Sequence, residues 1–311
     1  MFPTRQSVVA LLCAVAVAAQ EPVAWEPRAV STVLEAQVEL HRRGFSCGPI
    51  DGVAGGQTAA TLRAFQRAEG LGEAGALDAA TREHLRLTAP ALKVHMVTAE
   101  DFTGLRPLPA TWLEKSQAPE LAHATLLERL AERHRAGVNF LRRLNPGTDW
   151  EALEPGASVT VPAVGPIAFA GRAAQIVIRL EARELEATDA DGRVLLHSPV
   201  SIARKVEKRP SGELQVIVVV REPNYTFDPA VFPESEEGQA LGRRLILPPG
   251  PNNPVGRAWI GLNLPGYGIH GTPDPEKVGR TESHGCFRLA NWDALALLEL
   301  VRVGLAVRVE P

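Results

Sequence analysis

Apolar side chains in the N-terminal third of the chain recur at helical spacing. In residues 31–87 this pattern predicts three short helices, with Ser31, Thr58 and Asp78 as the expected N-caps. A loop rich in turn residues, GPIDG at 48–52, follows the first helix. The pattern therefore predicts a small three-helix domain whose core is formed by Leu34, Val38, Leu40, Leu62, Phe65 and Leu85.

The C-terminal block, residues 166–311, has the short apolar runs that are typical of strands. The run 214–220 (LQVIVVV) is almost continuously β-branched or apolar, so we expect a strand buried on both faces. A single helix is expected after Asn291, which we take as its N-cap. One helix among several strands indicates a mostly antiparallel β domain. The expected strands are 176–180, 194–202, 214–220, 259–262 and 307–309.

The first twenty residues have the layout of a secretory signal peptide. A positively charged start is followed by an apolar run at 8–19 and by small residues that offer A-x-A cleavage sites. The run is too short to span a bilayer, although a buried N-terminal helix would show the same pattern. Leu12 stands where lipoprotein processing needs a small residue, which disfavours lipidation of Cys13. We expect an exported protein of the periplasm or cell envelope.

Composition narrows the class of protein. The chain has 311 residues, 45% apolar and 22% charged, with a net charge of −3. These values are typical of a soluble globular protein of two or three domains, and they argue against a nucleic-acid binder. Three cysteines exclude a disulfide scaffold, and only Cys47 and Cys286 would remain after export. We expect Cys47 to be a buried small hydrophobe.

Two C-terminal segments combine the residues needed for nucleophilic catalysis: GIHGT at 268–272 and SHGCFRL at 283–289. Cysteine needs a base to form the reactive thiolate, and histidine titrates nearest neutrality. His270 and Cys286 are the natural pair, with a rate expected to vary with their joint titration between pH 5 and 9. Backbone N–H groups of Gly285 and Cys286 could stabilise an oxyanion, and Arg288 could hold a carboxylate.

Three structural alternatives remain open for these residues. Cys286 could be a buried structural cysteine, and His270 could be a core histidine. Alternatively, His270, His284 and Cys286 could bind zinc, since histidine and cysteine are its usual ligands.

The two segments closely resemble the catalytic signature of the L,D-transpeptidase family, whose domain is called YkuD-type. The segments RPSGE (209–213), EPNYTFDP (222–229) and LPPGPNNPVGRAWIGLNLPGYGIHGT (247–272) also resemble family motifs, in the same order. The resemblance implies a β-sandwich with Cys286 as nucleophile and His270 as general base and acid, and no metal or organic cofactor. It further implies supporting or oxyanion roles for Ser283, His284, Gly285 and Gly271, and substrate contacts for Arg288, Tyr267 and Trp259.

The reaction that this resemblance implies is acyl transfer on peptidoglycan. The cysteine attacks the bond between diaminopimelate and D-alanine in a tetrapeptide stem, and an amine resolves the thioester. The acceptor would be a neighbouring stem or a lysine of an envelope protein. With water as acceptor the protein would be an L,D-carboxypeptidase. A non-catalytic wall-binding protein is the third alternative.

The other two blocks resemble wall-binding modules. Residues 31–87 are similar to the three-helix peptidoglycan-binding domain, through GPIDG, a threonine and LRAFQ. The middle block, 92–164, has an expected helix at 124–135, and its end, FLRRLNPGTDWEALEPGASVTVPAV, resembles half a LysM module. Its front half is longer than usual, so glycan binding and a pure spacer role are both open. The predicted fold is multidomain α+β: helical domain, LysM-like segment, β catalytic domain.

Overall fold

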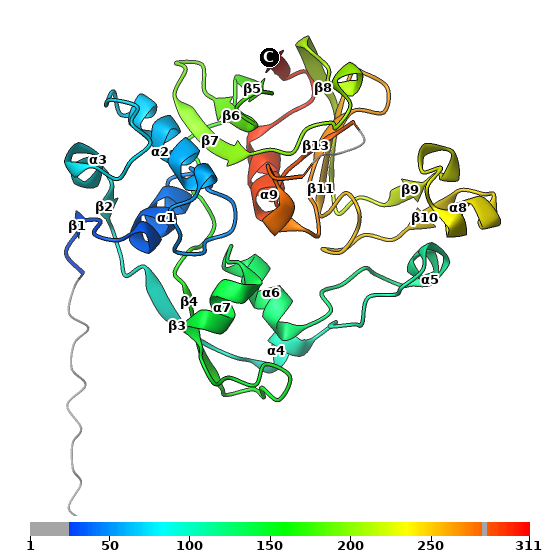
Figure 1. Cartoon of the computed structure of the whole chain (residues 1–311), viewed down its shortest axis with the longest axis horizontal. Helices are drawn as coiled ribbons and strands as arrows, with labels where there is room; N and C mark the ends of the chain where they lie inside the picture. The colour runs from blue at the N-terminus through cyan, green and yellow to red at the C-terminus, as the bar shows by residue number, and fades with distance from the viewer. Residues whose placement is uncertain (1–24, 282–284) are drawn as a thin grey trace, which may run out of the picture.

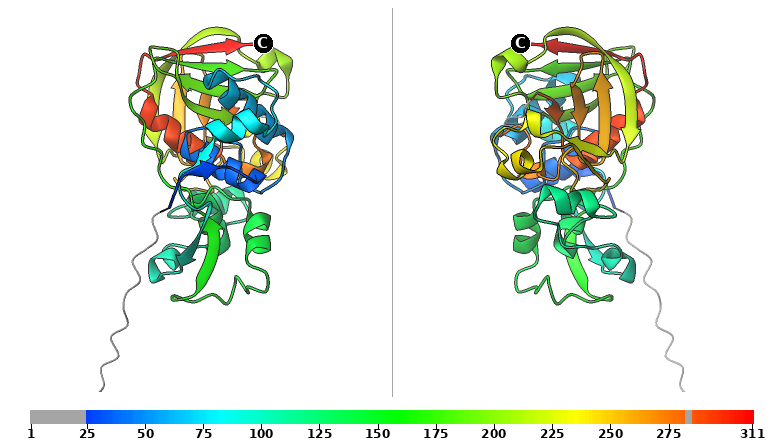
Figure 2. Two further views of the ribbon diagram at one scale, coloured as in Figure 1. Left: turned by 90° about the vertical axis from the view of Figure 1, so that its left-hand side faces the viewer. Right: turned by 90° about the vertical axis from the view of Figure 1, so that its right-hand side faces the viewer.

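The computed structural model describes residues 25–281 and 285–311 (Figure 1). The expected signal peptide, and the candidate residues Ser283 and His284, lie outside the described residues. Among the residues that are described, no helix has the length and apolar character needed to cross a membrane. Figure 2 shows the middle block at one end of the molecule, with the large sheet of the C-terminal block at the other.

Three helices form the N-terminal block, as the pattern predicted, and two short strands pair antiparallel at its edge. Its core contains Leu40, Phe65 and Leu85, together with Cys47, which is 3% exposed as expected for a buried small residue. The elements are β1 (Arg28–Ala29), α1 (Val33–Arg42), α2 (Gly56–Ala68), α3 (Ala79–His84) and β2 (Arg86–Leu87).

Two of the three predicted N-caps in this block are wrong. Thr32 caps α1 by accepting from the Glu35 N–H, while Ser31 instead donates its hydroxyl to the Glu35 carboxylate at 2.8 Å. Thr58 lies inside α2, where its hydroxyl accepts a hydrogen bond from the Gln37 side chain at 3.0 Å. Asp78 caps α3 as predicted. A serine or threonine before an apolar stripe therefore marked the neighbourhood of the first two helix starts, but not their exact positions.

The middle block consists of a two-stranded antiparallel sheet and short helices. The predicted helix at 124–135 is present as α6, and Leu130, Leu141 and Val161 are fully buried in the block's core. Leu105 still packs against this core, and the following residues 106–122 leave it and carry α5 toward the C-terminal block (Figure 1). The elements are β3 (Leu92–Met96), α4 (Ala99–Phe102), α5 (Trp112–Gln117), α6 (Leu126–Arg133), α7 (Val138–Leu144) and β4 (Ser158–Pro162).

The largest sheet among the described residues has eight strands in the order β13-β12-β11-β8-β14-β5-β6-β7. The pairs β12/β13 and β14/β5 are parallel, and the others are antiparallel, as the mostly antiparallel prediction required. Ser201, just after β7, bridges Arg288 of β13, so the two ends of the sheet meet. The β-sandwich that the resemblance implied is therefore formed by a single sheet that curls on itself. Its strands are β5 (Gln175–Arg179), β6 (Glu184–Thr188), β7 (Val194–Pro199), β8 (Gly212–Arg221), β11 (Ala258–Leu262), β12 (Gly268–His270), β13 (Phe287–Arg288) and β14 (Ala306–Glu310).

Helix α9 (Asn291–Leu300) packs against the concave side of this sheet and completes its core. Leu297 and Leu300 are fully buried together with Ile176 and Ile260 from the sheet. Ala290 occupies the N-cap position, so the prediction that Asn291 caps α9 is wrong.

The prediction that the run 214–220 is buried on both faces is also wrong. Val216 is fully buried, but Ile217 is 52% exposed and Val220 is 36% exposed. The register of β8 against β11 shifts between Gly261 and Leu262, which leaves Ile217 as the extra residue of a bulge. A run without alternation could not show which side chains face the core.

A small flap, residues 225–247, stands beside the curled sheet. Its strands β9 (Tyr225–Phe227) and β10 (Leu245–Leu247) pair antiparallel, with α8 (Glu236–Leu241) between them. The fully buried Phe227 and Leu247 form a separate cluster with Leu121 of the middle block. Short 3₁₀ turns complete the described chain at Val206–Lys208, Pro229–Val231 and Pro275–Lys277.

Candidate active site

A cavity of about 650 Å³ lies between the flap and the edge of the sheet formed by β11, β12 and β13. It is lined by Cys286, His270 and Arg288, the three residues that the sequence singled out for chemistry. Apolar and aromatic side chains form most of the remaining wall, namely Trp112, Val220, Pro223, Tyr225, Val231, Phe232, Pro254, Val255 and Trp259.

The parallel pairing of β12 and β13 brings the two sequence motifs together. Ile269 lies opposite Phe287, and His270 lies opposite Arg288. The Leu289 N–H donates to the His270 carbonyl at 2.8 Å, which continues the ladder. Because residues two apart on a strand share a face, Cys286 and Arg288 both reach the cavity.

His270 is held in one orientation by its backbone and by an aromatic neighbour. Its Nδ1 lies 2.6 Å from the Gly271 carbonyl oxygen, and the Trp259 indole stacks on the ring at 5.7 Å between centroids. A carbonyl can only accept, so we assign the proton to Nδ1, which leaves Nε2 with a free lone pair. The imidazole therefore has the tautomer that a general base requires.

Burial sets the charge state of the histidine and the thiol. Burial lowers the pKa of His270 to about 4, and the charge of Arg288 acts in the same direction. Burial also raises the pKa of the Cys286 thiol, although a backbone hydrogen bond from Gly268 and the charge of Arg288 oppose this shift. The thiol donates to the Gly266 carbonyl at 3.4 Å. The resting pair at neutral pH is therefore a neutral thiol and a neutral imidazole.

Arg288 places a positive charge in this largely apolar cavity. Its backbone exchanges two hydrogen bonds with Ser201, each 3.0 Å long, and its side chain is half-buried. Burial lowers the pKa of Arg288, while the neighbouring Cys286 and Asp274 favour its charged form. Burial also raises the pKa of Tyr225 to about 12, so its hydroxyl stays protonated at neutral pH. A guanidinium at this position is suited to a substrate carboxylate.

The other sequence-predicted site residues fall into three groups. Gly285 and Trp259 line the cavity with Cys286. Gly271 contributes its carbonyl to His270, and the ring of Tyr267 lies beside Gly285, where a Cβ would come within 3.7 Å of it. The structural roles of Ser283 and His284 stay predictions.

Sequence reasoning missed much of the cavity wall, including Trp112 and Tyr225, and one supporting residue. Trp112 enters the cavity from the middle block, and Tyr225 enters from the flap. The EPNYTFDP motif contained Tyr225 without indicating which member would face the site. Nothing in the pattern around Trp112 connected it with residues more than a hundred positions away.

The supporting residue is Asn291, which lies behind His270. Its Oδ1 accepts from the Arg257 N–H at 3.2 Å, and its Nδ2 donates to Glu132 of α6 at 2.9 Å and to the Pro251 carbonyl at 3.1 Å. A Cβ on Gly271 would overlap Asn291 Oδ1. Asn291 therefore packs on the peptide that orients the His270 ring, and this explains why it does not cap α9.

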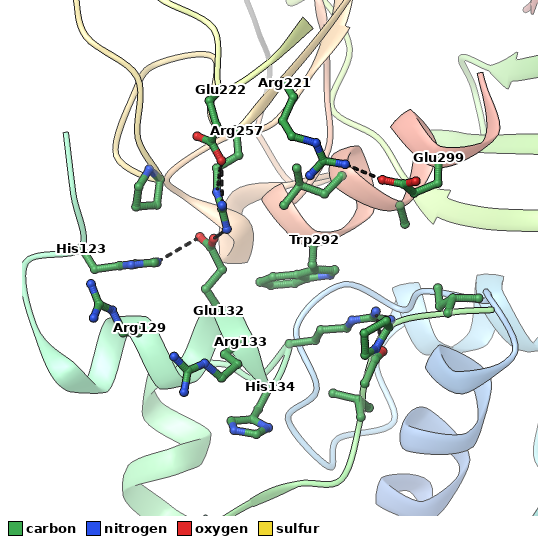
Figure 3. A pocket seen from close by; sticks show the side chains of 18 of the residues that line it. His123, Arg129, Glu132, Arg133, His134, Arg221, Glu222, Arg257, Trp292 and Glu299 are labelled. Atoms are coloured by element: carbon green, nitrogen blue, oxygen red, sulfur yellow. Dashed lines mark hydrogen bonds and ion pairs between the residues drawn. The ribbon is translucent and has the colours of Figure 1, made fainter. Parts of the chain in front are cut away.

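Figure 3 shows where Asn291's partner Glu132 lies, in a second, charged cavity between the middle and C-terminal blocks. Arg257 pairs with Glu222 at 2.6 Å and approaches Glu132 at 3.7 Å. Arg221 pairs with Glu299 across the same space. An ion pair between Glu132 of α6 and Arg257 therefore connects α6 to the loop that precedes β11, which supports the cavity.

Replacing Asn291 by alanine is expected to lower the free energy of unfolding by about 2 kcal/mol, because buried and partly buried partners lose their hydrogen bonds. The rate constant kcat should fall as well, since the Gly271 peptide loses its support. Urea unfolding and turnover measurements check both expectations. Unchanged stability together with unchanged turnover would show that Asn291 does not support the site.

Comparison with known proteins identifies the class of this site. Residues 173–309 match the YkuD family, described as the L,D-transpeptidase catalytic domain. Residues 30–85 match a putative peptidoglycan binding domain. The site thus belongs to an acyltransferase domain joined to a wall-binding domain. Residues 173–309 therefore form an L,D-transpeptidase catalytic domain of the YkuD family.

The chain is similar to several named relatives. It is 28% identical over 186 residues to a putative L,D-transpeptidase YkuD of Bacillus licheniformis, covering 60% of this chain and 93% of the relative. It is 28% identical to the probable L,D-transpeptidase ErfK/SrfK of Escherichia coli, covering 59% of this chain and 58% of that protein. A solved L,D-transpeptidase from Mycobacterium smegmatis is 20% identical, with a TM-score of 0.35 over 50% of this chain and 64% of that one.

Proposed function

We propose that this protein transfers acyl groups between peptidoglycan stems through a thioester on Cys286. The supporting observation is the joint placement of Cys286, His270 and Arg288 in one cavity, with the Nδ1 proton of His270 directed to the Gly271 carbonyl. The proposed donor is a tetrapeptide stem, cleaved between diaminopimelate and D-alanine. The family match supports this substrate class, and the geometry supports the roles of the residues.

The proposed acylation begins from neutral groups. His270 Nε2 takes the Cys286 proton as the sulfur attacks the scissile carbonyl, and the same proton then passes to the departing amine of D-alanine. Backbone N–H groups of Gly285 and Cys286 stabilise the oxyanion. Arg288 holds a carboxylate of the stem. This sequence leaves a thioester on Cys286 and a neutral histidine.

Deacylation reverses the proton movements with a new nucleophile. An acceptor amine attacks the thioester, His270 accepts its proton, and the cysteine sulfur leaves and is reprotonated. The acceptor is proposed to be the side-chain amine of a neighbouring stem.

The N-terminal block would supply binding to the wall polymer. It is fixed against the sheet rather than tethered, because the Ser46 N–H donates to the His197 carbonyl at 2.8 Å and Arg67 pairs with Glu186 at 2.6 Å. A bound polymer raises the local concentration of stems near the cavity. We propose a location in the cell envelope, reached by export.

Mass spectrometry of products from purified disaccharide-tetrapeptides tests the proposal. Cross-linked dimers with released D-alanine are the expected products. Tripeptides alone would identify a carboxypeptidase, and attachment of stems to a lysine of an added envelope protein would identify an anchoring enzyme. Absence of any turnover by the wild-type protein would support a non-catalytic wall-binding protein and overturn the proposal.

Exhaustive chelation is expected to leave turnover unchanged, since the proposed roles of His270 and Cys286 require no metal. The measurement compares rates before and after dialysis against a strong chelator, with metal-content analysis of both samples. A loss of activity that zinc restores would favour the zinc-ligand alternative for His270, His284 and Cys286.

A further inference from the structure

The long front half of the middle block contains a segment that packs on another block. This segment, residues 106–122, is called the strap here and includes α5. Its apolar side chains join the cluster formed by Phe227, Leu245 and Leu247 of the flap, and not the core of the middle block. The strap residues in that cluster are Trp112, Leu113, Ala118 and Leu121. Figure 1 shows α5 lying beside β10 and α8.

Backbone hydrogen bonds fix the C-terminal end of the strap. The Leu121 N–H donates to the Pro249 carbonyl at 2.8 Å, and the Asn252 N–H donates to the Leu121 carbonyl at 2.9 Å. Gly250 has a φ of 138°, and a Cβ there would overlap Leu121. The loop after β10 therefore has the shape that the strap requires.

A carboxylate fixes the start of α5. The N–H groups of Trp112 and Leu113 both donate to the Glu237 side chain of α8, each at 2.9 Å. These hydrogen bonds join residues more than 120 positions apart. The strap is therefore fixed to the flap at α5 and to the loop after β10 at its C-terminal end.

Docking places one strap side chain in the catalytic cavity. The Trp112 ring stacks on Phe227 with centroids 4.3 Å apart and an interplanar angle of 15°, and Phe232 lies 6.4 Å away. Trp112 lines the cavity that contains Cys286, whereas its neighbour Leu113 packs in the flap cluster outside the described lining. A residue outside the matched catalytic domain, 173–309, thus forms part of the catalytic cavity.

We propose that the strap is a substrate-binding element and that Trp112 is a specificity-determining residue for the stem peptide. The ligand it would contact is an aliphatic stretch of the peptide next to the scissile bond, since Trp112, Phe232 and Val231 offer apolar surface there. The identity of this ligand rests on the proposed function. The middle block would then complete the substrate site in addition to connecting its neighbours.

Steady-state kinetics of the full chain test this role. Trp112→Ala is expected to raise KM for the tetrapeptide donor about tenfold while kcat changes by less than about threefold, because binding surface is lost but the reacting groups stay. The KM of Trp112→Phe should lie between the values of the wild type and of Trp112→Ala. Leu113→Ala is the matched control: it removes packing from the same cluster and should lower the melting temperature without raising KM. An unchanged KM in Trp112→Ala would overturn the proposal.

Docking itself is tested through Glu237. Glu237→Ala removes the acceptor of the hydrogen bonds from the Trp112 and Leu113 N–H groups. Like Trp112→Ala, this variant is expected to raise KM for the donor. The exposed neighbour Glu236 provides the control, and Glu236→Ala should leave KM unchanged. Equal KM values for Glu237→Ala and Glu236→Ala would show that anchoring by Glu237 does not position Trp112.

Alkylation of Cys286 tests the strap without any substrate. Rates at Cys286, followed by peptide mass mapping, are compared for iodoacetamide and for the bulkier N-phenylmaleimide. Trp112→Ala should accelerate the bulky reagent several-fold relative to the small one, and Leu113→Ala should not. An unchanged ratio would overturn the placement of Trp112 in the cavity that contains Cys286. Failure of wild-type turnover would instead overturn the proposed function alone.

Discussion

The Cys286→Ala protein is expected to lose acyl transfer by on the order of a millionfold, to the background of the assay. The reason is chemical: alanine cannot form the thioester, and no other described side chain in the cavity is a thiol. The substitution removes only a sulfur atom from a half-buried position, so the fold should be retained. Product mass spectrometry and thermal unfolding of the same preparation separate loss of chemistry from loss of structure.

Cys47 provides the matched control for this experiment. It is 3% exposed in the core of the N-terminal block, and burial strongly raises the pKa of its thiol, which disfavours the reactive thiolate. Cys47→Ala should therefore keep full turnover. Transfer that persists in Cys286→Ala but disappears in Cys47→Ala would show that the nucleophile has been assigned to the wrong cysteine.

His270→Gln is expected to lower kcat by roughly a thousandfold, within the usual range for removal of a general base. Glutamine can still donate to the Gly271 carbonyl and fill part of the ring's space, but it cannot accept the Cys286 proton. Single-turnover acylation measures the first step directly. A rate within about tenfold of the wild type would mean that another group, or water, takes the proton.

The pH dependence gives an independent check on the same residue. Because the pKa of His270 is lowered to about 4, its basic form predominates above that pH and is lost as the pH falls through 4. The raised pKa of Cys286 moves the alkaline limb above the ordinary thiol range. We therefore expect kcat/KM to be nearly constant from about pH 5 to pH 8, in contrast to the variation expected from sequence alone. An acid limb near pH 6.5 would contradict the burial of His270.

The same shift has a consequence for stability. The unfolded chain takes up a proton at this histidine near pH 6.5, whereas the folded protein does so near pH 4. The folded state thus binds fewer protons between these values, and the contribution of His270 to stability falls as the pH is lowered from 6.5 to 4.

The middle block contacts the catalytic cavity from two sides. The strap brings Trp112 to the cavity wall, and Glu132 of α6 bonds to Asn291 behind His270. The resemblance to a wall-binding module accounts for neither contact. Loss of the middle block should therefore alter the catalytic site itself as well as its distance from the N-terminal block.

The sequence predicted the helices well where the signal is local, and the residues it offered as nucleophile and base line one cavity. Helix stripes and the turn at 48–52 depend on neighbouring side chains, and the candidate nucleophile Cys286 and candidate base His270 lie within 16 positions of each other. The faces of β8 were predicted wrongly because its β-branched run has no alternation and a bulge at Ile217 resets the register. The predicted caps were displaced for separate reasons: Thr32 rather than Ser31 caps α1, Gly55 occupies the N-cap position of α2, and the Asn291 side chain is engaged in tertiary hydrogen bonds.

By itself, the amino-acid sequence determined the family of the catalytic domain and the candidate nucleophile and base, and it predicted a three-part organisation. The tertiary structure alone decided the protonation states of those groups and which residues surround them. Burial set the pKa of His270, the parallel pairing of β12 and β13 set its neighbours, and the docked strap added Trp112 to the cavity. These properties depend on contacts between residues far apart in the chain, and spacing along a sequence carries no information about desolvation or about which distant surfaces meet.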